Sequence, residues 1–120
     1  MRVSYSPGYY ASIPNEHIFP IKKFQGLHAY LLEREILQKS EIIEPKMVDF
    51  INLMTAHTQR YSYGVWNGSL DKKEIRRMGL PWTKSLAIRS RLAVQGTLNA
   101  GIMALQDGIA GNMAGGTHHA

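Results

Sequence analysis

Two adjacent histidines near the end of the sequence are the residues best suited to chemistry. They close the run Gly115-Gly116-Thr117-His118-His119. Imidazole titrates near neutral pH, so a pair of histidines can transfer protons in a reaction. The two preceding glycines allow a sharp turn or a close backbone approach to a substrate. Neighbouring residues on an extended strand point to opposite sides, so both imidazoles reach one site only if the chain turns here.

Two other interpretations of the dipeptide are open. Histidines at a chain end also arise as the remnant of a purification tag. A histidine pair can also bind a metal, although neighbours on one strand rarely chelate the same ion. The dipeptide alone does not decide among these interpretations.

The segments that would position the histidines alternate between strand and helix patterns. Residues 109–114 read as a buried strand that leads directly into the glycines, and residues 83–106 form the longest helical stretch. Its small residues, among them Gly96 and Gly101, indicate close packing against a sheet or helix, since glycine costs about 1 kcal/mol inside a helix.

Shorter segments complete this pattern. Residues 2–5 and 41–44 are predicted strands, and residues 21–38 carry apolar side chains at helical spacing. Further short helices are predicted at 46–54, 55–66 and 71–78. The order predicts an α/β fold with a parallel sheet, in which ligands bind beyond the carboxyl ends of the strands.

Composition narrows the class of protein. The 120 residues suffice for one domain, and the absence of cysteine excludes disulfides and thiolate metal sites. We expect a cytoplasmic protein, because no stretch resembles a signal peptide or a membrane span. The net charge of +5 is concentrated in residues 60–91, which suggests a second hypothesis of a small basic module that contacts nucleic acid. A solvated surface explains the same charges, and we favour that explanation.

Several segments, in the right order, resemble the histone deacetylase family. Residues 109–120 are similar to the family's strand and Gly-Gly-x-His-His-Ala signature, and residues 57–61 to its His-Thr/Ser-x-x-Tyr element. Residues 5–9 and 17–24 resemble its opening strand and the loop before its first helix. The resemblance spans nearly the whole chain and is nearest to bacterial and class IV members.

The resemblance implies a fold and a domain organisation. The fold is the three-layer α/β architecture with a parallel sheet of the arginase/deacetylase superfamily. Residues 1–120 would be the N-terminal portion of a single deacetylase domain, truncated after the tandem histidines. Half of such a sheet exposes a strand edge and apolar surface, so we expect this portion to associate with itself.

The resemblance also implies an activity, the hydrolysis of an acylated amine such as acetyl-lysine by a zinc-dependent enzyme. His119 would be the general base and His118 its charge-supporting partner, with Gly115 and Gly116 as backbone of the substrate pocket. His17 and Lys23 would border that pocket. The family's zinc ligands lie downstream of the tandem histidines, so we expect no zinc ligand and no turnover in residues 1–120.

Two further histidines have predicted structural roles. His57 and Tyr61 are four residues apart and would share a helix face, which suggests a buried, hydrogen-bonded histidine. His28 lies among the apolar residues of the first predicted helix and is expected at the edge of the core.

Overall fold

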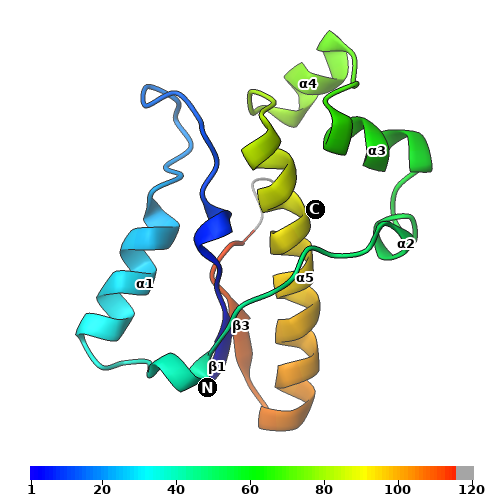
Figure 1. The fold of residues 1–120 in the computed structure, drawn as a ribbon. Coiled ribbons are helices and arrows are strands. Elements are labelled where there is room, and N and C mark those ends of the chain that lie inside the picture. The colour runs from blue at the N-terminus through cyan, green and yellow to red at the C-terminus, as the bar shows by residue number, and fades with distance from the viewer. Residues whose placement is uncertain (116–120) are drawn as a thin grey trace.

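A three-stranded parallel sheet lies at the centre of the computed structural model, which describes residues 1–115 (Figure 1). Strand β1 (Arg2–Ser4) lies between β2 (Ile42–Ile43) and β3 (Ala110–Asn112). Both neighbours pair with β1 in parallel, with Val3 opposite Ile42 on one side and opposite Gly111 on the other. The prediction of an α/β fold with a parallel sheet is therefore confirmed.

The two long helices cover opposite faces of this sheet. Helix α1 (Lys23–Glu33) connects β1 to β2, and α5 (Lys84–Asp107) precedes β3 (Figure 1). The chain moves from β1 outward to β2 and then returns past β1 to β3. Since parallel crossovers are right-handed, this reversal of direction places the second crossover on the other face.

Side chains along β1 alternate between these two helices, as the strand period of two requires. The Arg2 guanidinium binds Asp107 and Gln106 at the end of α5. On the opposite face, the Tyr5 ring stacks on the His28 ring of α1 at a centroid distance of 3.9 Å. His28 is half-buried, which agrees with its predicted place at the edge of the core.

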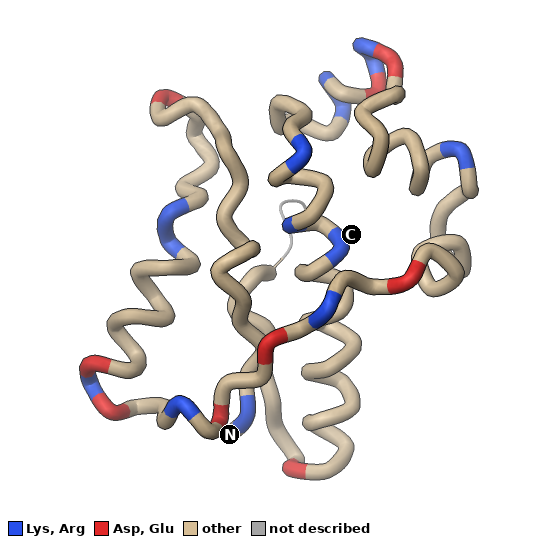
Figure 2. The backbone as a smooth tube through the Cα atoms, in the orientation of Figure 1, with Lys and Arg blue, Asp and Glu red and all other residues tan. Residues whose placement is uncertain are grey.

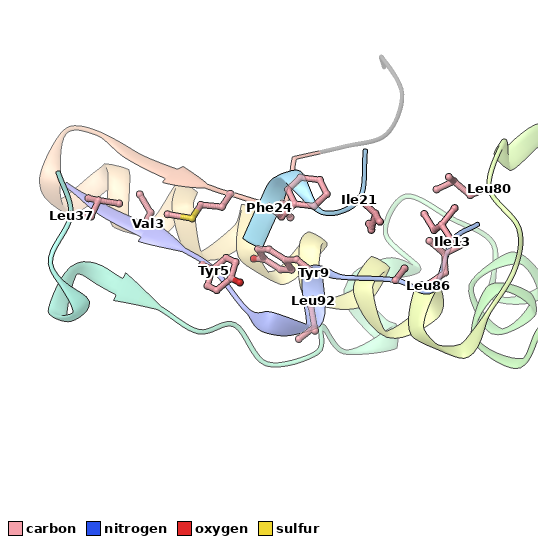
Figure 3. Packing of buried hydrophobic residues seen from close by; sticks show 13 residues of the cluster. Val3, Tyr5, Tyr9, Ile13, Ile21, Phe24, Leu37, Leu80, Leu86 and Leu92 are labelled. Carbon is pink, nitrogen blue, oxygen red and sulfur yellow. The ribbon is translucent and has the colours of Figure 1, made fainter. Parts of the chain in front are cut away.

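The hydrophobic core fills the space around β1 and along α5 (Figure 3). Its members come from the first strand, the loop that follows, α1 and α5, so that segments far apart in the sequence share one core. The buried members that Figure 3 labels are Val3, Tyr5, Tyr9, Ile13, Ile21, Phe24, Leu37, Leu80, Leu86 and Leu92.

Short helices occupy the connections, and their ends follow the capping residues of the sequence. The 3-10 helices are η1 (Pro7–Tyr9) and η2 (Lys39–Glu41), and the α-helices are α2 (Phe50–Leu53), α3 (Gln59–Asn67) and α4 (Lys72–Met78). Thr58 caps α3, and Asp71 caps α4 with Glu74 as its capping-box partner.

Glycines directly follow three of the α-helices. Gly68, Gly79 and Gly108 follow α3, α4 and α5, and all three have positive φ angles between 71° and 81°. Such angles suit glycine, which has no Cβ to clash in the left-handed region.

Three predicted helices are shorter in the structure. The stretch 55–66 is helical only from Gln59. The stretch 21–38 is helical only over Lys23–Glu33, because Glu35 adopts a φ of 54° and turns the chain so that Leu37 reaches the core. The stretch 46–54 is helical only from Phe50, since the Val48 amide donates to the Arg91 carbonyl oxygen and holds the preceding residues extended along α5.

In the part of the chain that the structure describes, no helix combines the length and the apolarity that crossing a membrane requires.

Candidate functional site at the carboxyl end of β3

The predicted site begins where β3 ends. Gly115, the last described residue, is exposed and has a φ of 57°, so the backbone leaves the strand through a left-handed conformation that favours glycine. Gly116, His118 and His119 lie outside the described residues. Residues 109–114 do contain the predicted strand, which is parallel to β1, although it is limited to Ala110–Asn112 and is half-buried rather than buried.

Asn112 fixes the end of β3 through four hydrogen bonds. Its Oδ1 accepts from the Tyr9 hydroxyl at 2.8 Å and from the Ala114 amide at 3.1 Å. Its Nδ2 donates to the Ala93 carbonyl at 2.9 Å and to the Thr97 hydroxyl at 3.1 Å, both on α5. One side chain therefore joins the strand end, the loop after β1 and the long helix.

Gly96 gives Tyr9 and Asn112 the room they need against α5. A Cβ placed on Gly96 would collide with the Tyr9 hydroxyl oxygen and would lie 2.7 Å from Asn112 Oδ1. The prediction of close packing is thus confirmed at Gly96. At Gly101 it is wrong, because this glycine is exposed and a Cβ there would meet nothing within 4 Å.

Arg89 connects the carboxyl ends of β1 and β3. It comes from α5 and is only 3% exposed. Its Nε donates to the Tyr9 carbonyl at 2.9 Å and its Nη2 to the Ala114 carbonyl at 3.4 Å. The guanidinium also lies 4.9 Å from the centre of the Phe24 ring. Arg89 therefore fixes the backbone immediately before Gly115 relative to the loop that follows β1.

The Arg89 charge is held by carbonyl oxygens and aromatic rings, and no carboxylate of residues 1–115 forms an ion pair with it. Burial lowers the pKa of the Arg89 guanidinium, an effect that the nearby Tyr9 partly opposes. Burial likewise raises the pKa of the Tyr9 phenol, so Tyr9 stays a neutral donor to Asn112. Arg89 and Tyr9 thus form a fixed positioning network and are poorly suited to proton transfer themselves.

A pocket of about 250 Å³ opens beside Gly115, between the end of β3 and the first half of α5. Its walls are mostly apolar, with a few polar groups from α5. The residues that line it are Met78, Leu80, Leu86, Arg89, Ser90, Ala93, Val94, Thr97 and Gly115. Of the glycines predicted to form pocket backbone, Gly115 does line a pocket.

The two predicted rim residues contact different parts of the fold. Lys23 Nζ is 5.2 Å from the centre of the Phe24 ring, so Lys23 and Arg89 both approach this ring. His17 Nε2 is 3.2 Å from the Gly79 carbonyl oxygen, and its Nδ1 accepts from the Phe19 amide. These partners select the neutral Nε2–H tautomer. Neither His17 nor Lys23 lines the pocket beside Gly115.

His57 does not take the structural role predicted for it. It precedes the first residue of α3 and is exposed rather than buried, although the centre of its ring lies 5.5 Å from that of Tyr61. The Thr58 hydroxyl caps α3 by accepting from the Tyr61 amide at 3.2 Å, and this cap excludes His57 from the helix.

The described residues do not include a metal site. Within residues 1–115, no three histidine, cysteine, aspartate or glutamate side chains lie together in a way that could hold an ion. The residues around Gly115 therefore do not provide a zinc site by themselves.

The basic residues of 60–91 are spread over α3, α4 and α5 (Figure 2). Arg60 pairs with Glu74, Arg89 is buried, and the Arg91 guanidinium donates twice to the Val48 carbonyl. Four exposed basic side chains remain on α4: Lys72, Lys73, Arg76 and Arg77. Binding of nucleic acid through residues 60–91 stays a prediction.

Residues 1–115 thus define a small α/β unit whose central parallel strands end at a network of Tyr9, Arg89 and Asn112. No protein-family model matches the chain. An uncharacterized protein of Picosynechococcus sp. is 42% identical over 118 residues, which make up 98% of this chain and 39% of that protein. The chain therefore spans about two fifths of the length of this relative.

Proposed function

We propose that this chain is the N-terminal part of a zinc-dependent deacylase with the arginase/deacetylase fold, and that His118 and His119 belong to its active site. The reaction is hydrolysis of an amide, in which water and an N-acyl amine give a carboxylic acid and a free amine. An acylated lysine is the substrate class that the resemblance suggests.

The observation that carries this proposal is the place in the fold of Gly115, the first residue of the glycine-histidine motif. The motif follows a parallel strand at its carboxyl end, where α/β proteins bind their ligands. Gly115 leaves the strand with a positive φ and lines a pocket. The network of Arg89 and Asn112 fixes the backbone up to Ala114, the residue before Gly115.

The two histidines have separate roles in this proposal. His119 removes a proton from the attacking water, and His118 carries positive charge that stabilises the oxyanion as the tetrahedral intermediate forms. The proton taken by His119 then passes to the leaving amine. Zinc would act as a Lewis acid in the complete enzyme. Residues 1–115 contain no group of side chains that could hold a metal ion. The zinc ligands are therefore expected outside residues 1–115.

The experiment that tests the proposal is expression of the longest polypeptide whose reading frame contains this chain. We expect it to copurify with about one zinc ion per active site, to contain an Asp-x-His sequence after the tandem histidines, and to release acetate from an acetyl-lysine peptide. A reading frame without an Asp-x-His sequence, or a purified polypeptide that binds no zinc, would contradict the proposal.

A further inference from the structure

A second pocket, of about 240 Å³, lies between α3 and the first half of α5, with α2 at one end. We propose that it binds a small organic carboxylate with an apolar body, held by Arg91 at its charged end. This inference does not depend on the proposed deacylase activity, because Arg91 lines this pocket and not the one beside Gly115, although the two pockets share Met78, Ser90 and Val94.

Arg91 supplies a fixed positive charge at the wall of this pocket. Its Nε and Nη2 both donate to the Val48 carbonyl oxygen, at 2.9 and 2.7 Å. Its guanidinium lies 4.4 Å from the centre of the Phe50 ring and 4.7 Å from that of Trp66. These contacts set the orientation of the guanidinium before any ligand arrives, which reduces the entropy that binding would cost.

The Arg91 charge is available to an incoming anion. Within residues 1–115, no carboxylate forms an ion pair with Arg91 and no acceptor binds its Nη1. An arginine that is partly desolvated between aromatic rings forms strong charge-assisted hydrogen bonds to a carboxylate.

Ser62 adds a buried hydroxyl to the wall of this pocket. This residue of α3 lines the pocket and is only 6% exposed, and its hydroxyl has no hydrogen-bond partner in the described part of the chain. A buried hydroxyl without a partner costs about 1–3 kcal/mol. The Ser62 oxygen is shielded from solvent, so we expect its side chain to rotate toward the pocket and donate to a ligand oxygen when the ligand binds. His57 and Tyr61 add polar groups on the same side.

The remaining walls select the body of the ligand. They are formed mainly by Leu53, Val65, Trp66, Met78 and Val94, which favour an aromatic or branched aliphatic group. A phosphate group would need more donors than one guanidinium nitrogen and a few hydroxyls provide, whereas a carboxylate needs only two or three. The volume is below the usual range for drug-sized ligands, which indicates a small acid.

Titration of the protein with benzoate, followed by amide and indole NMR shifts, tests this inference. We expect saturable shifts at the Ser62 and Val65 amides and the Trp66 indole, while the Val3 and Leu37 amides in the distant part of the core stay unchanged. Benzamide, a neutral molecule of the same shape, should bind at least about tenfold more weakly, because it lacks the charge that Arg91 recognises.

Three variants complete the test. Arg91→Gln should weaken benzoate binding at least about tenfold, and Ser62→Ala should weaken it by about threefold, as expected for loss of a neutral hydrogen bond. Arg76→Gln removes an exposed charge from α4 outside the pocket and should change nothing.

Equal affinity for benzoate and benzamide, saturable shifts outside the pocket, or no saturable shift would each overturn the proposal. Wild-type affinity in Arg91→Gln would also overturn it. If Arg91→Gln fails to fold because the contact with Val48 is lost, two other measurements test the proposal. They are the ratio of the benzoate and benzamide affinities of the unmodified protein, and the benzoate affinity of Ser62→Ala. A ratio near one, or wild-type affinity in Ser62→Ala, would then refute it.

Discussion

The phenolic oxygen of Tyr9 occupies the space that a side chain on Gly96 would need. Tyr9 follows β1 and Gly96 lies in the middle of α5, so this contact sets how closely the long helix approaches the strand ends. The same phenol donates to Asn112, the last residue of β3. The geometry before the tandem histidines therefore depends on a glycine that carries no chemistry of its own.

Substitution of this glycine should be costly. Gly96→Ala forces Tyr9 and Asn112 to move and should lower the free energy of unfolding by about 1–3 kcal/mol, as other overpacked cores do. Gly101→Ala is the matched control, because a Cβ there meets nothing within 4 Å. It should raise the free energy of unfolding by about 0.5–1 kcal/mol through helix propensity. Urea denaturation of both variants checks this, and a stabilised Gly96→Ala would contradict the packing described.

Removal of the Arg89 guanidinium should loosen the end of β3. Arg89→Met leaves the carbonyl oxygens of Tyr9 and Ala114 without their donor, which should lower the free energy of unfolding by about 2–3 kcal/mol. Faster hydrogen exchange should accompany this at the Ala114 amide. Arg76→Met, on the exposed face of α4, should change stability by less than about 0.5 kcal/mol. Equal changes in the free energy of unfolding for the two substitutions would show that Arg89 does not stabilise the end of β3.

The sequence predicted the local features of this fold better than the contacts between distant residues. The predicted helix 71–78 is found as α4, between Asp71 and Gly79, because capping depends on residues adjacent in the chain. The predicted helix 55–66 began too early, since Thr58 caps α3. The parallel sheet also followed from the order of the elements. Arg89 was missed as part of the site, because its partners Tyr9 and Ala114 are 80 and 25 residues away in sequence. A polar Asn112 within an apolar strand was the one local signal of the network.

Exposed apolar residues misled the prediction of helix lengths and faces. Ile51 and Ile36 belong to the predicted helices 46–54 and 21–38, but they are 71% and 58% exposed. A periodic pattern identifies an apolar face without showing what covers it. Nothing in the pattern revealed that Glu35 would turn the chain and leave Ile36 outside.

The ion pair between Arg2 and Asp107 should make the folding stability of the protein depend weakly on pH in the acid range. The hydrogen bond from Arg2 lowers the pKa of the Asp107 carboxyl in the folded state. Because the pKa of Asp107 is lower in the folded than in the unfolded protein, its ion pair stabilises the fold at pH values above the unfolded-state pKa. This stabilisation is lost as the pH falls through the folded-state pKa, below about pH 4. In Arg2→Ala, an NMR titration should show the Asp107 pKa rising toward its ordinary value. An unchanged pKa would mean that the ion pair is absent in solution.

The outer face of α5 should make the protein associate with itself. Val94, Leu98, Ile102 and Leu105 follow one another at helical spacing and are 40–91% exposed. Such a row of apolar side chains favours contact with an identical row on a second copy. Light scattering should show dimers or larger species at high concentration. Ile102→Lys should shift them toward monomer, and Ile51→Lys, on α2, should not. A monomer at all concentrations would contradict this expectation.

The most direct test of the central claim is the rate of amide hydrolysis by the longest polypeptide that contains this chain, with and without His119. We predict that the zinc-loaded protein hydrolyses an acetyl-lysine peptide and that His119→Ala lowers kcat/KM by at least about a hundredfold, as expected for loss of a general base. His57→Ala, at an exposed position outside the pocket beside Gly115, should retain wild-type kcat/KM. Wild-type kcat/KM in His119→Ala, or no hydrolysis by the unmodified protein, would contradict it.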